Sequence, residues 1–177
     1  AEASLLWHKQ VGTIENGTVA NAPSPQILVD GCLIYSSDTK LYKCSLSDGS
    51  TVASADMAGS SAFTYTAPTY GAGMIFVPLD GGKVQAFRAS DLTPLWLYTD
   101  PLGGQDQSPL TYGDGYLYGS FYLATGASHF VCIPVTDENP AQTNESKYAS
   151  WTYSGSRAFY WAGAALAGDY VLVGSDG

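Results

Sequence analysis

The sequence predicts an all-β chain built from repeated units of four short antiparallel strands. Apolar runs of strand length recur along the 177 residues. Turn-forming residues separate these runs at the spacing of roughly eight to twelve residues that is typical of all-β proteins. No segment shows a sustained helical apolar period, so we expect no helix. The pattern is clearest in residues 67–98, which define the unit.

Each part of this unit has its own strand or turn signal. Residues 74–79 form a continuous apolar run, and 84–89 return after the turn Asp80-Gly81-Gly82, whose residues tolerate positive φ. The last strand is centred on Trp96. The four predicted strands are 68–70, 74–79, 84–89 and 94–98.

The same pattern recurs on both sides of the unit. Leu5 to Lys9 resemble a fourth strand, because Trp7 lies where Trp96 lies in the unit. Residues 137–147 form a polar insertion in a later copy, before a predicted strand that carries Trp151. The predicted units are a blade end at 5–12, full blades at 22–59, 66–100 and 107–155, and a half blade at 162–177.

The register of these copies predicts a β-propeller. Cys32, Met74, Tyr116 and Tyr170 open the second strands, at intervals of 42, 42 and 54 residues, the last lengthened by the insertion. A fixed period with four strands per unit is typical of propeller blades, which bury their faces against their neighbours. We therefore predict one partial β-propeller domain, residues 1–177, of about three and a half blades.

An open fan of blades leaves exposed sheet edges, which favour pairing with further strands. The sequence stops inside a predicted hairpin at Gly177. We therefore expect either that the chain is a fragment of a longer protein or that two copies complement each other as a homo-oligomer. The start at Ala1 without Met suggests a processed or trimmed N-terminus.

Composition excludes several classes of partner. Seven Lys and Arg residues face 16 Asp and Glu residues, giving a net charge of −9 without a basic cluster. Such a surface repels nucleic acids and anionic membranes. The chain has no apolar stretch long enough for a transmembrane helix. Low Lys content with abundant Tyr, Ser, Thr and Gly indicates an exported bacterial protein that is secreted, on the cell surface or periplasmic.

The three cysteines predict neither a metal centre nor a clear disulfide framework. Cys32, Cys44 and Cys132 lie in strand-like runs, where a free thiol behaves as a small buried apolar side chain. A Cys32–Cys44 disulfide is the alternative, although the predicted hairpin places the two residues off register. The chain has no C-x-x-C motif, and His8 and His129 are far apart, so we expect no bound metal.

Two stretches resemble a known repeat family. The consensus of pyrroloquinoline-quinone-type propeller repeats reads roughly G-x-V-Y-x-G-x-x-D-G-x-L-Y-A-L-D-A-x-T-G-x-x-x-W. Residues 31–49, GCLIYSSDTKLYKCSLSDG, and 73–96, GMIFVPLDGGKVQAFRASDLTPLW, are similar to it. The resemblance implies the propeller fold, but such repeats serve many functions.

The family contains enzymes and non-catalytic proteins. For a quinone-dependent dehydrogenase, the resemblance implies a quinone over a Trp on the propeller axis, Ca²⁺, a catalytic Asp and a vicinal disulfide. No two cysteines are adjacent here, and the motif A-x-D-x-x-x-G-x-x-x-W fails in each copy. The departures are Arg88 and Leu92 at the Asp and Gly positions of one copy, and Lys43, Ser45 and Ala53 at the Ala, Asp and Trp positions of another.

No other catalytic motif replaces the missing one. Asp114, Asp169 and Asp176 stand beside Gly in turns, where positive φ and local bonding explain them. The chain has no G-x-S-x-G elbow, Walker loop or H-E-x-x-H motif. We therefore predict no catalytic residues and no cofactor, with a fragment of a quinone- and Ca²⁺-dependent dehydrogenase as the alternative.

Two connectors between blades carry aromatic residues beyond what the repeat requires. Such connectors line one face of a propeller near its axis, and aromatic rings with an Arg suit a sugar or a peptide. The alternative is that the rings fill the central channel or pack between blades. The candidate ligand-binding residues are Phe63, Tyr65, Arg157, Phe159, Tyr160 and Trp161. The prediction is a non-catalytic binding or scaffold module for a protein or carbohydrate, similar in its repeats to the propeller lipoprotein of the outer-membrane β-barrel assembly machinery.

Overall fold

The computed structural model describes residues 4–11, 13–15, 18–20, 22–61, 66–105, 108–159 and 161–175. These residues form seventeen β-strands and no helix, which confirms the all-β prediction. Consequently, none of the described residues lies in a helix that could cross a bilayer.

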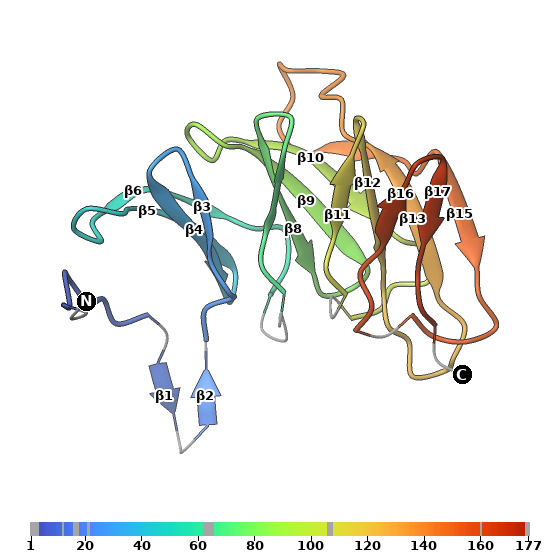
Figure 1. Cartoon of the computed structure of the whole chain (residues 1–177), viewed down its shortest axis with the longest axis horizontal. Helices are drawn as coiled ribbons and strands as arrows, with labels where there is room; N and C mark the ends of the chain where they lie inside the picture. The colour runs from blue at the N-terminus through green and yellow to red at the C-terminus, as the bar shows by residue number, and fades with distance from the viewer. Residues whose placement is uncertain are drawn as a thin grey trace.

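Four-stranded antiparallel sheets follow one another along the chain, as Figure 1 shows. Blade one is β3 (Ile27–Val29), β4 (Cys32–Ser37), β5 (Lys40–Ser45) and β6 (Thr51–Asp56). Blade two is β7 (Thr69–Gly71), β8 (Met74–Leu79), β9 (Lys83–Arg88) and β10 (Pro94–Thr99). Blade three is β11 (Thr111–Gly113), β12 (Tyr116–Ser120), β13 (His129–Pro134) and β15 (Trp151–Ser154). The pair β16 (Ala165–Ala167) and β17 (Tyr170–Leu172) follows at the red end of the row.

The N-terminal segment differs from the expected fourth strand. Residues 5–9 adopt no strand conformation, and β1 (Thr13–Glu15) pairs with β2 (Thr18–Ala20) in a separate hairpin. Trp7 nevertheless contacts blade one, because its indole N–H donates to the Leu46 carbonyl at 2.8 Å. Trp7 therefore contacts blade one, although its own segment forms no backbone ladder with that blade.

Blade two is buried on both faces, which explains its continuous apolar strand β8. Ile75, Val77 and Leu79 pack with Ile34 and Leu41 of blade one. The other face of the blade packs against blade three, through Phe76, Val84, Ala86, Trp96 and Tyr98 against Leu117, Phe121, Val131, Ile133 and Val135. Alternate side chains of one strand thus reach two neighbouring blades.

The polar insertion adds a fifth strand to blade two. β14 (Glu145–Lys147) pairs in parallel with β10, although it belongs in sequence to the connection between β13 and β15. The Lys147 amine donates to the Thr136 carbonyl and the Glu138 carboxylate, and lies 5.8 Å from the centre of the Trp96 ring. The insertion therefore links blade three to blade two, and we call this link the clasp.

Candidate functional site

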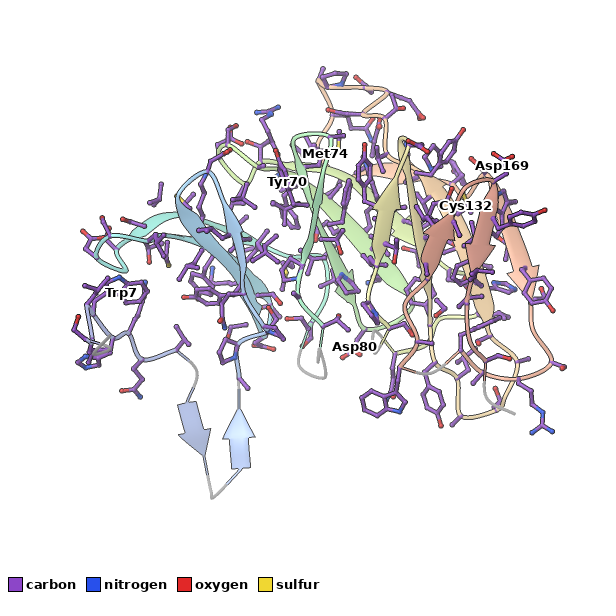
Figure 2. The ribbon with its side chains drawn as sticks, in the orientation of Figure 1. Trp7, Tyr70, Met74, Asp80, Cys132 and Asp169 are labelled. Carbon is purple, nitrogen blue, oxygen red and sulfur yellow. The ribbon has the colours of Figure 1, made fainter. Side chains whose placement is uncertain are left out.

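The connectors and the turns between second and third strands lie at one end of the blades. In Figure 2 Asp80 marks this end, while Met74 and Asp169 mark the opposite end. We call this end the connector face. It comprises the connectors 57–61, 100–105, 155–159 and 161–164, the turns at Asp38–Thr39 and Asp80–Gly82, and the loop 121–128.

Backbone hydrogen bonds join this face into a continuous network. The Ser61 N–H donates to the Asp38 carbonyl of blade one, at 2.7 Å. The Asp80 N–H of blade two donates to the Ser60 carbonyl, at 2.9 Å. The connector 57–61 is therefore held by both of the blades that it joins.

Gly82 is required where the next connector crosses the turn of blade two. The N–H groups of Gly81 and Gly82 both donate to the Gly104 carbonyl, at 2.9 and 2.8 Å. At φ +71°, a Cβ on Gly82 would lie 2.6 Å from the Gly103 carbonyl oxygen. Only glycine permits this approach without a shift of the backbone.

A buried carboxylate anchors the connector between blades two and three. Asp100 accepts hydrogen bonds from the Tyr98 hydroxyl at 2.9 Å and the Leu102 N–H at 2.9 Å. Nδ1 of His129 lies 2.8 Å from the same carboxylate. Burial, followed by the charge of Asp100, raises the pKa of Tyr98 well above its ordinary value. The carboxylate is surrounded by groups that position it, so the cluster orders the loop.

The predicted ligand-binding residues separate into exposed and buried groups. Arg157 is exposed, and Trp161 is 53% exposed at φ +65°. Phe159 is only 2% exposed, and its ring centre lies 5.8 Å from that of Phe130. Its N–H donates to Ser128 Oγ at 3.1 Å, so Phe159 supports the loop from inside. Phe63, Tyr65 and Tyr160 lie outside the described residues.

The structure also contains a cleft that the sequence did not reveal. It encloses about 350 Å³ at the rim between blades two and three, beneath the insertion. Its walls include hydroxyl groups, an exposed ring and apolar side chains, from Leu97, Thr99, Pro101, Ser146, Tyr148 and Thr152. The sequence showed the polar insertion, which forms part of this cleft. It did not show that a segment of the insertion pairs with β10 as a strand, because a polar composition does not indicate such pairing.

The residues of the described part of the chain do not fit a quinone and Ca²⁺ site. Ca²⁺ takes six to eight oxygen ligands, several of them carboxylates. No group of three His, Cys, Asp or Glu side chains lies close enough to hold a metal within the described ranges. All three cysteines are free, with Cys44 and Cys132 buried and Cys32 half-buried, so no vicinal disulfide is formed.

The successive four-stranded antiparallel sheets, packed face to face, define a β-propeller fold. No protein-family model and no curated protein matches the sequence. Among solved structures, the chain is similar to BamB from Moraxella catarrhalis, with a TM-score of 0.63 and 12% identity over 97% of this chain and 47% of that one. It is similar to the computationally designed Ika4 protein, with a TM-score of 0.61 and 9% identity over 98% of this chain and 93% of that one.

A dehydrogenase shares the same fold. A europium-containing methanol dehydrogenase matches with a TM-score of 0.58 and 11% identity, over 73% of this chain and 24% of the enzyme. The chain thus spans about half the length of BamB and a quarter of the enzyme. At such identities the likeness shows the fold alone, and one fold serves both kinds of protein.

Proposed function

We propose that the chain is a non-catalytic binding or scaffold module, which presents its connector face to a protein or carbohydrate outside the cytoplasm. The observation that carries this proposal is the exposure of Trp161 and Arg157 on a connector whose neighbour, Phe159, is fixed in the core. Trp and Arg dominate recognition surfaces when a rigid support limits the entropy lost on binding.

The net charge of the chain limits the kinds of partner surface that it can bind. A net charge of −9 favours association with neutral or basic surfaces and disfavours acidic ones. Arg157 supplies a planar group of donors on the same connector as Trp161, which suits a backbone carbonyl or a sugar hydroxyl. We propose secretion or a periplasmic or cell-surface location on composition, and the likeness to BamB supports a scaffold role.

Selection from a defined probe set tests this function. A phage-displayed random peptide library and an array of neutral oligosaccharides are screened with the wild-type chain. We expect Trp161→Ala and Arg157→Ala to weaken any selected binder at least about tenfold, which corresponds to losing one good contact. Tyr148→Ala removes a ring that is more exposed than Trp161 and lies away from the connector face, and it serves as the control. Binding that survives both connector variants would contradict the proposal.

The second candidate is a piece of a quinone-dependent dehydrogenase, which the structural match to methanol dehydrogenase favours. Pyrroloquinoline quinone and Ca²⁺ are added while absorbance and the thermal midpoint are recorded. A ligand that binds only the folded state raises the midpoint with concentration. We expect no change in either readout, and a saturable stabilisation would favour the enzyme over the binding module.

A further inference from the structure

The cleft between blades two and three, which we call the rim cleft, is formed by two complete blades. One wall is the end of β10 with the connector after it, and the other is the segment that leads from β14 into β15. Blades two and three each contain four described strands of their own, and these strands supply both walls. Of the residues that line the cleft, only Pro101 belongs to the connector face.

The segment that carries Tyr148 is held to a blade on each side of this residue. Before it, the Lys147 amine donates to the Thr136 carbonyl and the Glu138 carboxylate. After it, the Ser150 N–H donates to the Cys132 carbonyl of blade three at 2.7 Å. The Tyr148 side chain is nevertheless 77% exposed. An exposed ring on a fixed segment loses little backbone entropy when a ligand binds.

The opposite wall of the rim cleft is fixed in a similar way. The Tyr98 ring stacks on Phe121, with 6.3 Å between the ring centres, and its hydroxyl donates to Asp100 at 2.9 Å. The Asp100 carboxylate also accepts from the Leu102 N–H at 2.9 Å. Pro101 lies between these two bonded residues. The cleft is therefore preformed, as small-molecule sites usually are.

The charge of the lining indicates a neutral ligand. Lys147 is the one charged residue among the described residues that line the cleft. Its side chain is 1% exposed, and its amine is paired with the Glu138 carboxylate at 2.9 Å. The lining therefore offers no free cation to an anionic ligand and no carboxylate to a cationic one.

Hydroxyl groups surround the aromatic ring of the cleft. Thr99, Ser146 and Thr152 are exposed, and none of their hydroxyls hydrogen-bonds to another described residue. Each hydroxyl can donate one hydrogen bond and accept two. A purely apolar ligand would displace water from these groups without replacing its hydrogen bonds, at a cost in affinity. The favoured ligand combines an apolar face with several hydroxyls.

We propose that the rim cleft binds a neutral pyranose sugar. The C–H face of the sugar ring stacks on Tyr148, and its hydroxyls exchange hydrogen bonds with Thr99, Ser146 and Thr152. The cleft volume of about 350 Å³ is at the lower end of the range for small-molecule sites, which suits one sugar ring. One ring makes few contacts, so we expect a dissociation constant in the millimolar range.

Titration of the ¹⁵N-labelled full chain with methyl β-glucopyranoside, methyl β-galactopyranoside and methyl α-mannopyranoside tests the proposal. We expect at least one of the three sugars to cause saturable shifts of the amide signals that line the cleft, namely those of Thr99, Ser146, Tyr148 and Thr152. Sorbitol is the control ligand, because it carries similar hydroxyls but has no ring face. We expect no saturable shift with sorbitol.

Variants of two lining residues separate stacking from hydrogen bonding. Tyr148→Ala removes the ring and should weaken binding at least about tenfold. Tyr148→Phe keeps the ring and should bind within about twofold of the wild type. Thr152→Val keeps the shape of the side chain but removes the hydroxyl, and should weaken binding about threefold. Amide exchange in β14 checks that each variant keeps the walls of the cleft.

Four results would overturn the proposal. They are the absence of a saturable shift at the cleft with all three sugars, equal shifts with sorbitol, and wild-type affinity in Tyr148→Ala. The fourth is a saturable shift of the same amides by N-acetyl-tyrosinamide and by no sugar, because the occupant is then a peptide.

The rim cleft and the connector face are tested separately. A ligand of millimolar affinity is too weak to be retained on the oligosaccharide array, so the array reports the connector face. Trp161→Ala alters the connector face and should leave the affinity of the cleft for the sugar unchanged. Loss of sugar binding in this variant would place the sugar on the connector face and contradict the assignment to the cleft.

Discussion

Trp96 joins blade two to blade three, because its indole N–H donates to the Val135 carbonyl at 3.2 Å. Lys43 joins blade one to blade two in the same way. Its amine donates to the Ala89 carbonyl at 2.8 Å and to the Ser90 carbonyl at 2.9 Å, and Ala89 follows its third strand as Val135 does. Ala53, at the Trp position, pairs directly with Lys43 and leaves room for the longer side chain. The departures from the repeat at these two positions therefore compensate each other.

Replacing Lys43 with Ala should lower the free energy of unfolding by about 2–3 kcal/mol, because the buried Ala89 carbonyl and the partly buried Ser90 carbonyl lose a charged donor. Urea denaturation measures the change. Lys40→Ala, on the same strand, is the control. Its ion pair with Asp56 is solvent-exposed, so we expect little effect. Equal losses in the two variants would contradict the role of Lys43.

Tyr98 makes stability depend on pH in the alkaline range. Its pKa is raised in the folded state, mainly by burial and then by Asp100, whereas an unfolded tyrosine titrates near about 10. Above that pH the unfolded chain loses a proton that the folded chain keeps, so stability falls as pH rises.

Thermal unfolding between pH 9 and 12 checks this dependence. The fall in midpoint should be shallower in Tyr98→Phe, which removes the titrating group and keeps the ring stacked on Phe121. Tyr148→Phe, at a position that is 77% exposed, is the control. An unchanged slope in Tyr98→Phe would show that burial of this hydroxyl does not govern the alkaline loss.

At the level of elements, the strand β14 is attached to blade two by hydrogen bonds of buried polar side chains. Gln85 is fully buried; its Oε1 accepts from the Ala58 N–H, and its Nε2 donates to Asn144 Oδ1, each at 2.7 Å. Together with Lys147, these bonds hold the insertion against blade two. Both polar atoms of the Gln85 side chain therefore have a partner, as its burial requires.

Lys147→Ala should release β14 from β10 while leaving the rest of blade two intact. The variant removes the donor to Thr136 and Glu138 and the contact with Trp96. We expect amide exchange in β14 to become at least about tenfold faster, with β8 and β9 unchanged. Ser146→Ala alters the exposed side chain of the same strand and is the control. Unchanged protection of β14 would contradict the clasp.

Substitutions at two glycines with nearly the same φ distinguish the cost of backbone strain from the cost of steric crowding. Gly73 has φ +73° and open space around it, so Gly73→Ala should cost about 1 kcal/mol. Gly82→Ala adds a collision with the Gly103 carbonyl and should cost more than about 3 kcal/mol. Chemical denaturation compares the two variants. Similar costs would mean that the turn and the connector are not in contact.

The strands that follow apolar alternation were predictable from the sequence. β8 matches its predicted range, and β9 and β10 lie within one residue of theirs. β14 was not predictable, because ESK carries no apolar signal and its stability comes from contacts with distant residues. For the same reason the sequence placed Phe159 at a binding surface, whereas packing on Phe130 buries it.

Across the whole molecule, burial depends on the number of neighbouring blades. Blade two is covered on both faces and has the most continuous buried strands, β8 and β9. The exposed large apolar side chains are concentrated after residue 147, in β15, β16 and β17. A single blade is too thin to exclude water from its own core, so its stability comes from the adjacent blades.

Residue-resolved hydrogen–deuterium exchange of the full chain tests this dependence most directly, because exchange reports the free energy of local opening. We predict the slowest exchange in β8 and β9, intermediate rates in blades one and three, and the fastest rates among the described blade strands in β16 and β17. Uniform protection across these strands, or exchange in β9 as fast as in β17, would contradict the conclusion that each blade is stabilised by its neighbours.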